Sequence, residues 1–293
     1  MYKLDNLTII FPSYNCDRSC PFCIAKNNRK FNSDKSVDFD GLVNCLEEFR
    51  ENGIHFGRIV LSGNGEPSLY SMEELEKCAR IIKNNQDLFD ALRVHTSGNI
   101  FWEKDKFDLF NDLVPDVEFD VLRVAINSER DMQILKYERD YTQTDEFKRA
   151  KGIRLDIGLT KELERYTLPE ELERLLQDYP NIRLVKFKNL MSGEREESSQ
   201  AKWVNGTRIN KEEFVEFATH LLSYYGCTSM DDLISKSGKR IIFKKSGSYP
   251  KDIVYSDGVI RDYAENPLDI LSIKKMAERV DNVNALGYFD RDR

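Results

Sequence analysis

Short apolar stretches alternate with amphipathic stretches over the first two thirds of this chain, and that rhythm limits what it can fold into. Stretches rich in aliphatic and β-branched residues predict six strands, at 7–11, 58–61, 92–96, 121–126, 153–159 and 182–187. Stretches with apolar residues at helical spacing, or of helix-like composition, predict helices at 38–52, 71–84, 129–137 and 169–177. Strands that alternate with helices indicate a parallel sheet, either open or curled into an incomplete barrel.

The rhythm ends near residue 190. Residues 192–206 are charged and are expected to form a loop, and residues 211–225 predict a helix. Short β-like runs follow at 240–244, 252–256 and 259–260, with turn signals between them. We therefore predict two domains, a core over residues 1–195 and a β-rich C-terminal cap over residues 196–293.

Composition narrows the classes of protein to consider. With 293 residues, of which 40% are hydrophobic, the chain can bury a large core. The formal net charge of −7 makes nucleic acid an unlikely partner, because affinity for nucleic acid comes mostly from neutralising phosphates. No apolar run approaches the ~20 residues that span a bilayer, and the start lacks the apolar segment of a secretory signal. These features predict a cytoplasmic protein without a membrane partner.

Three of the six cysteines, Cys16, Cys20 and Cys23, fall within eight residues. In a cytosolic chain, clustered cysteines indicate metal or redox chemistry more than disulfides. A structural zinc site usually takes four protein ligands, so zinc would have to borrow Cys45 or Cys78 from the predicted helices. An iron–sulfur cubane is normally held by four cysteines, and three would leave one iron open to an outside ligand.

A glycine-rich loop, residues 62–67, follows the second predicted strand. Gly63 and Gly65 allow a ligand to approach the backbone closely, and Pro67 restricts Glu66 to an extended conformation. The loop is suited to presenting backbone carbonyls to an ammonium group. The alternative is an ordinary connection between a strand and a helix.

The cysteine loop matches the C-x-x-x-C-x-Φ-C motif of the radical S-adenosylmethionine (radical SAM) superfamily, with Phe22 at the aromatic position. The glycine loop resembles that family's GGEP motif, with Asn64 in place of a glycine, and the resemblance covers about residues 5–192. It implies a partial (β/α)6 barrel that binds one [4Fe-4S] cluster through Cys16, Cys20 and Cys23. It also implies an enzyme that cleaves S-adenosylmethionine (SAM) to a 5′-deoxyadenosyl radical, using electrons from an external donor of the flavodoxin or ferredoxin type.

The resemblance also implies a set of SAM-binding residues. Ligands of parallel α/β sheets bind at the carboxyl ends of the strands, and polar or apolar residues there are candidates. Each of them has a plainer reading as a capping or turn residue. The predicted SAM-binding residues are Phe22, Gly63, Asn64, Gly65, Glu66, Pro67, Ser97, Asn127, Lys161 and Met191.

The tail resembles the hairpin region of family members that carry an extra cluster, which include the molybdenum-cofactor cyclase and peptide-maturing enzymes. Here the Asp257-Gly258 turn is not followed by a cysteine, and Cys227 is the only cysteine after Cys78. One thiol cannot hold a cluster, so the sequence predicts a single cluster.

Basic residues gather in the tail of this acidic chain, among them Arg240 and Arg261. Arginine suits phosphate, so we expect a small, anionic or nucleotide-like substrate. The alternatives are a peptide- or protein-modifying enzyme, such as a maturase or a glycyl-radical activase, and a non-catalytic iron–sulfur protein.

Overall fold

The computed structural model of this chain divides into two compact units. It describes residues 1–11, 16, 18, 20, 23, 37–63, 65–123, 141–161, 169–190, 199–230, 233–244, 252–256, 258–262 and 266–278. The first unit comprises Met1–Cys16, Ala25–Phe119 and Gly247–Asp281, and the second comprises Asp17–Ile24, Asp120–Ser246 and Asn282–Arg293.

The first unit is built on five strands in the order β3-β2-β1-β8-β9. They are β1 (Tyr2–Phe11), β2 (Ile54–Gly63), β3 (Phe89–Thr96), β8 (Asp252–Ser256) and β9 (Val259–Arg261). All neighbouring pairs are parallel except the antiparallel pair β8–β9. Its α-helices are α2 (Phe39–Glu51), α3 (Met72–Asn84), α4 (Lys104–Asn111) and α11 (Ile270–Ala277). Its 3₁₀ helices are η2 (Pro67–Leu69), η3 (Gln86–Leu88) and η4 (Asn99–Trp102).

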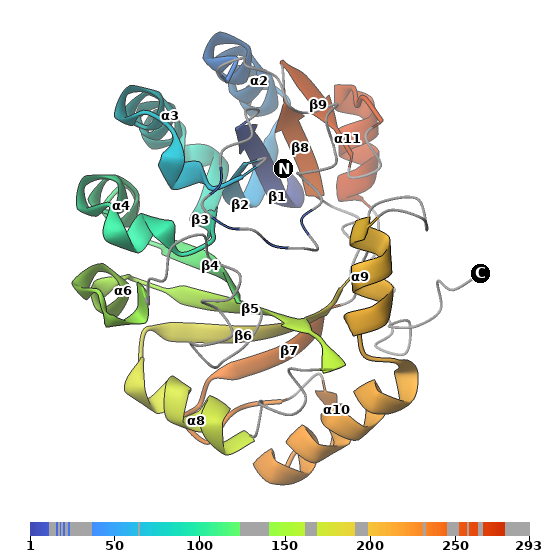
Figure 1. Ribbon diagram of the computed structural model, residues 1–293. Helices are drawn as coiled ribbons and strands as arrows, with labels where there is room; N and C mark the ends of the chain where they lie inside the picture. The colour runs from blue at the N-terminus through green and yellow to red at the C-terminus, as the bar shows by residue number, and fades with distance from the viewer. Residues whose placement is uncertain are drawn as a thin grey trace. The chain divides into compact units, whose positions relative to one another are not determined.

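Local sequence signals explain where these elements begin. The side chain of Ser71 accepts from the backbone of Glu74 at the start of α3, and the Glu74 carboxylate reaches back, which is the capping box that the sequence predicts. Helices α2, α3 and α4 lie along one face of β1–β3 (Figure 1). Tyr255 of β8 donates its hydroxyl to the backbone carbonyl of Asp38 at the start of α2, at 2.6 Å. The late strand β8 is therefore fastened both to β1 and to the start of α2.

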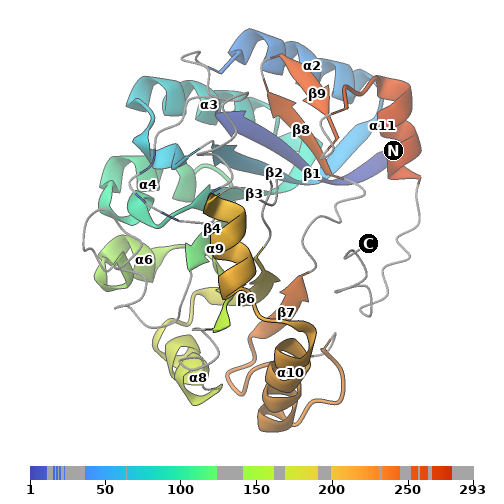
Figure 2. The same ribbon diagram turned by 45° about the vertical axis from the view of Figure 1, so that its right-hand side comes forward.

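The second unit contains β5 (Ile153–Leu159), β6 (Ile182–Asn189) and β7 (Arg240–Lys244), which pair in parallel in the order β7-β6-β5. Strand β4 (Val117–Arg123) begins in the first unit and ends in the second. The helices of the second unit are α6 (Asp145–Arg149), α8 (Pro169–Asp178), α9 (Ser199–Thr207), α10 (Lys211–Tyr225) and the 3₁₀ helix η5 (Tyr141–Gln143). Figure 2 shows α10 next to β7.

The two faces of β6 differ in chemistry. Phe187 packs edge-on against Phe217 of α10, with ring centroids 5.2 Å apart, and Phe243 of β7 lies against Phe214 of the same helix at 5.3 Å. Successive side chains of a strand point to opposite faces. Lys186 and Lys188 therefore point away from α10, to the face that is concave in a barrel of this kind.

The predicted fold class is confirmed: the chain is an α/β protein with a mostly parallel sheet, consistent with a partial barrel, and its C-terminal part contains an antiparallel strand pair, β8–β9. The strands predicted to form a β-rich cap do not form a separate layer. Strand β7 pairs in parallel with β6, and strand β8 pairs in parallel with β1. The domain boundary near residue 195 stays a prediction.

Three local predictions need correction or stay open. Residues 199–207, expected to be part of a loop, form α9, which buries Ala201 and Val204. The fourth strand begins at Val117, earlier than predicted. The helix predicted at 129–137 lies outside the described residues. None of the described helices is both long enough and apolar enough to cross a membrane.

Candidate active site

Glu66 is the centre of the loop that follows β2. Its side chain is 1% exposed. Oε1 accepts hydrogen bonds from the backbone N–H of Ser68 (3.2 Å), the hydroxyl of Ser68 (2.8 Å) and the hydroxyl of Thr96 (2.8 Å). Oε2 accepts from the backbone N–H of Ser97. One carboxylate thus fastens the loop after β2 to the carboxyl end of β3.

Further contacts hold the same corner. Thr96 Oγ1 accepts from the backbone N–H of Gly98 at 2.9 Å, and Asn99 Nδ2 donates to Ser68 Oγ at 3.1 Å. Lys106 Nζ donates to the backbone carbonyl of Ser68 at 2.7 Å. Gly98 has φ 104°, a conformation that favours glycine. The loop is therefore held from its own turn, from β3 and from α4.

The buried position changes the acidity of Glu66. Burial raises the pKa of its carboxyl, because a charge is costly away from water, while the hydrogen bonds from Ser97, Ser68 and Thr96 oppose that shift. All of these donors are uncharged, so among the described residues Glu66 is held by neutral hydrogen-bond donors.

Five of the residues predicted to bind SAM lie at this corner: Gly63, Gly65, Glu66, Pro67 and Ser97. The carboxylate of Glu66 is directed at protein donors, and the backbone N–H of Ser97 is directed at Glu66. A Cβ added to Gly63 would lie 3.5 Å from the backbone N and O of Gly65, an ordinary contact. In this geometry Glu66 positions the loop, and the glycines shape its backbone.

The cysteines of the predicted metal site are all free thiols, with Cys20 buried and Cys16 and Cys23 partly exposed. The backbone N–H of Cys23 donates to the carbonyl of Cys20 at 3.2 Å. The division between the two units falls just after Cys16, and most of the loop lies outside the described residues. Within the described part of the chain, no three Cys, His, Asp or Glu side chains gather as metal ligands.

The donor chemistry of these three thiols nevertheless fits an iron–sulfur cluster, which is held by cysteine thiolates. The alternative zinc ligands fit less well. Burial raises the pKa of both Cys45 and Cys78 to about 12, and Glu48 adds to the shift of Cys45. Metal ligation needs the thiolate, so both are poor donors. The cluster at Cys16, Cys20 and Cys23 stays a prediction.

Sequence reasoning missed Arg18, which lies between two of these cysteines. Its side chain is 1% exposed, and its guanidinium carbon lies 6.0 Å from the ring centroid of Tyr141 in the same unit. A buried arginine against an aromatic ring fixes the path of its segment. Arg18 therefore packs on Tyr141 within the second unit.

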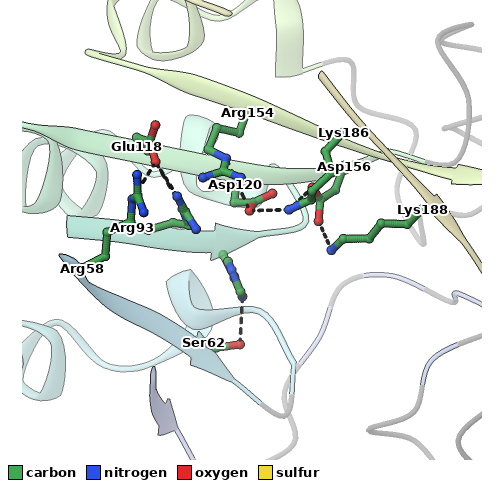
Figure 3. A network of polar contacts seen from close by, with 10 residues as sticks. Arg58, Ser62, Arg93, Glu118, Asp120, Arg154, Asp156, Lys186 and Lys188 are labelled. Carbon is green, nitrogen blue, oxygen red and sulfur yellow. Dashed lines mark hydrogen bonds and ion pairs between the residues drawn. The ribbon is translucent and has the colours of Figure 1, made fainter. Parts of the chain in front are cut away.

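Sequence reasoning also missed a buried network of charges on β4, β5 and β6 (Figure 3). Lys186 Nζ lies 3.1 Å from Asp120 Oδ2 and also pairs with Asp156, and Lys188 pairs with the other oxygen of Asp156. Arg154 Nε lies 3.9 Å from Asp120 Oδ2. Burial raises the pKa of Asp156, as does the neighbouring Asp120, whereas Lys188 and Lys186 lower it.

The first unit has a smaller counterpart of this network (Figure 3). Glu118 accepts from Arg93 at 2.7 Å and 3.2 Å, and Arg58 approaches the same carboxylate at 3.5 Å. A sequence signal for both networks exists. In 153–157 and 117–121, charged residues take every second place between apolar ones, the pattern of strands with one apolar face and one charged face.

The remaining predicted residues are less informative. Phe22, Asn64, Asn127 and Met191 lie outside the described residues. Lys161 is exposed just after β5. Of the two tail arginines, Arg240 is exposed, and Arg261 donates to the backbone carbonyl of Ser256 at 2.9 Å.

No family model and no curated protein matches this sequence. Solved structures do match the fold. The structure "Native anSMEcpe with bound AdoMet and Cp18Cys peptide" matches with a TM-score of 0.62 and 14% identity, covering 94% of this chain and 80% of that one. "Crystal structure of Streptococcus suis SuiB" matches with a TM-score of 0.55 and 13% identity, covering 88% and 60%.

A third match, "Native anSMEcpe with bound AdoMet", has a TM-score of 0.58 and 14% identity and covers 82% of this chain. The chain spans 64% of the length of that protein. At these identities the likeness concerns the fold. This chain shares the fold of these proteins, one of which was solved with bound AdoMet.

Proposed function

We propose that this chain is a radical SAM enzyme that carries one [4Fe-4S] cluster on Cys16, Cys20 and Cys23. The observation that carries the proposal is the loop held by Glu66 at the carboxyl ends of β2 and β3. It occurs in a chain whose fold matches a structure solved with bound AdoMet. Ligands of parallel α/β folds bind at this end of the strands.

The residues of the chain take distinct roles in this proposal. Gly63 and Gly65 let the SAM amino group approach the backbone, and Glu66 keeps that backbone in place through Thr96 and Ser97. Phe22, Asn64, Pro67, Asn127, Lys161 and Met191 complete the proposed SAM site. When bound, the cluster and SAM supply a radical that takes a hydrogen atom from the substrate.

A single cluster and an external electron donor of the flavodoxin or ferredoxin type complete the proposal. The sequence offers Cys227 alone beyond Cys78, and its thiol lies 3.8 Å from the backbone carbonyl of Tyr225. A second cluster would need several thiolates in one place.

The substrate that we propose is a small molecule with an anionic group, such as a nucleotide. A second candidate is a peptide, because one of the matched structures was solved with a bound peptide. The two candidates predict different stimulants of SAM cleavage, small anions or peptides. A non-catalytic iron–sulfur protein would bind iron and leave SAM intact.

Anaerobic reconstitution tests the proposal. The native protein should hold about four irons per chain and should cleave SAM to 5′-deoxyadenosine. Cys16→Ala, Cys20→Ala and Cys23→Ala should lose the cluster, whereas Cys45→Ala, which removes a partly buried thiol of high pKa, should keep it. Gly65→Val should keep its iron and lose SAM affinity. Tight stoichiometric zinc without iron, or iron without SAM cleavage, would refute the assignment.

A further inference from the structure

Lys188 differs from the other members of the buried network in its exposure. Lys186, Asp120 and Asp156 have side chains that are 4%, 2% and 7% exposed, and Arg154 is 10% exposed. The Lys188 side chain is 32% exposed. Lys188 is therefore the point at which this network meets solvent.

The position of Lys188 in the fold is that of a ligand site. It is the last residue but one of β6, close to the carboxyl end of that strand. In register it faces Gly158 of β5, and a Cβ added to Gly158 would meet the side chain of Leu190 at 2.8 Å. The apolar side chain of Leu190 thus lies against Gly158, the register partner of Lys188, at the end of the sheet where ligands of parallel folds bind.

The network also orients the ammonium group. Asp156 pairs with Lys188 through one oxygen and with Lys186 through the other. Lys186 is held in turn by Asp120. One carboxylate thus serves two ammonium groups, and an ammonium can donate three hydrogen bonds at once. Asp156 therefore fixes the direction of Lys188, while the single negative charge of Asp156 is shared between Lys186 and Lys188.

We propose that Lys188 binds the anionic group, a carboxylate or a phosphate, of a small-molecule substrate, with Asp156 as its positioning residue and Leu190 as an apolar neighbour. This inference rests on the proposed function, and it moves the anion site from the tail to β6. The tail arginines are less suited, since Arg261 is directed at the carbonyl of Ser256 and Arg240 extends into solvent.

The test uses the full chain, reconstituted anaerobically, and measures binding of inorganic phosphate and of acetate by calorimetry at constant ionic strength. We expect saturable binding of at least one of the two anions, and the tighter one identifies the chemistry of the group. Lys188→Met should weaken it about tenfold or more, because a hydrogen bond between charged groups is lost. Lys188→Arg, which keeps the charge, should retain most of the affinity.

Lys211→Met is the matched control, because it removes the same charge from an exposed site at the start of α10. It should bind both anions as the native protein does. Equal affinity in the native protein and Lys188→Met, or no saturable binding to the native protein, would overturn the proposal. A loss of SAM affinity in Lys188→Met would assign the ammonium to SAM and would overturn it as well.

Iron content and SAM cleavage of the native protein are measured in the same preparation. If both are absent while phosphate binding depends on Lys188, the anion site stands and the radical SAM assignment fails. If both are present and binding is indifferent to Lys188, the assignment stands and the anion site fails. The two ideas therefore fail separately.

Discussion

Glu66, in the loop after β2, and Asp156, within β5, are both buried carboxylates, yet they are stabilised in different ways. Glu66 accepts hydrogen bonds from the backbone N–H groups of Ser68 and Ser97 and from serine and threonine hydroxyls, all of them uncharged donors. Asp156 is paired with two lysines. Burial raises the pKa of both groups, but hydrogen bonds oppose the shift at Glu66 and lysine charges oppose it at Asp156.

The two kinds of partner, uncharged donors at Glu66 and lysines at Asp156, suit different structural roles. Uncharged donors set the path of a loop and add no net charge beside it, which suits a segment that must accept a charged ligand. Ion pairs cost desolvation on both sides and are weak evidence for stability as such. Their value in this chain is that they hold ammonium groups in fixed directions on one face of β6.

The largest effect on stability is expected when the ion-pair network around Asp156 loses a cation. Lys186→Met removes the ammonium shared by Asp120 and Asp156 and leaves buried negative charge poorly compensated. We expect the free energy of unfolding to fall by about 3–5 kcal/mol, measured by urea denaturation. Asp120→Asn added to Lys186→Met removes a charge of each sign and should restore most of the loss. If it does not, packing of the lysine stem explains the effect better than charge.

A smaller effect is expected at Glu66, and its dependence on pH distinguishes it. Glu66→Gln replaces one acceptor oxygen by a donor, which should cost about 1–3 kcal/mol. The pKa of Glu66 is raised in the folded state. Its favourable contribution to the free energy of unfolding is therefore fully present below the unfolded pKa of about 4.3 and is lost as pH rises through the folded pKa. The stability advantage of the native protein over Glu66→Gln should therefore shrink as pH rises above about 4.3.

Asp87→Asn is the control of opposite sign for that experiment. Hydrogen bonding to Arg50 lowers the pKa of Asp87, so the advantage of the native protein over Asp87→Asn should grow as pH rises through the acidic range. Urea denaturation over a pH series measures both. The same direction in the two variants would show that the Glu66 carboxyl is not desolvated as the fold implies.

The smallest effect is expected at an exposed ion pair. Lys3 Nζ lies 2.9 Å from Asp90 Oδ2, and the two side chains are 58% and 55% exposed. Lys3→Ala should change the free energy of unfolding by less than about 1 kcal/mol, and added salt should reduce even that. If Lys3→Ala lowered the free energy of unfolding as much as Lys186→Met, exposure would not explain the difference between exposed and buried ion pairs.

Much of the fold could be predicted because its signals are local. The capping box of Ser71 and Glu74 and the apolar spacing after it define α3 within the chain itself. The early start of β4 was missed because Glu118 and Asp120 look like surface residues, whereas both are largely buried and paired with cations. Charged residues within a strand suggest a loop unless their alternation with apolar residues is recognised.

The candidate site was predictable in its residues and less so in its contacts. The sequence placed Glu66 in a motif, but its partners Thr96 and Ser97 are about thirty positions away, and only pairing of β2 with β3 joins them. The Lys186 network depends likewise on the register of β5 and β6. Such contacts are set by tertiary structure, which a pattern along the chain does not encode.

The place of β8 beside β1 has a consequence for the order in which the protein can be completed. β1 is synthesised long before one of its two neighbours, β8 (Asp252–Ser256), which lies far along the chain. Tyr255 reaches Asp38 across a sequence separation of 217 residues. A growing chain therefore carries β1 with one open edge until Asp252–Ser256 is synthesised, and open edges invite pairing with other chains. Pairing of β1 with β8 is a contact of large sequence separation, of the kind that forms slowly, and until it forms the nascent chain has an unpaired strand edge that is prone to aggregation.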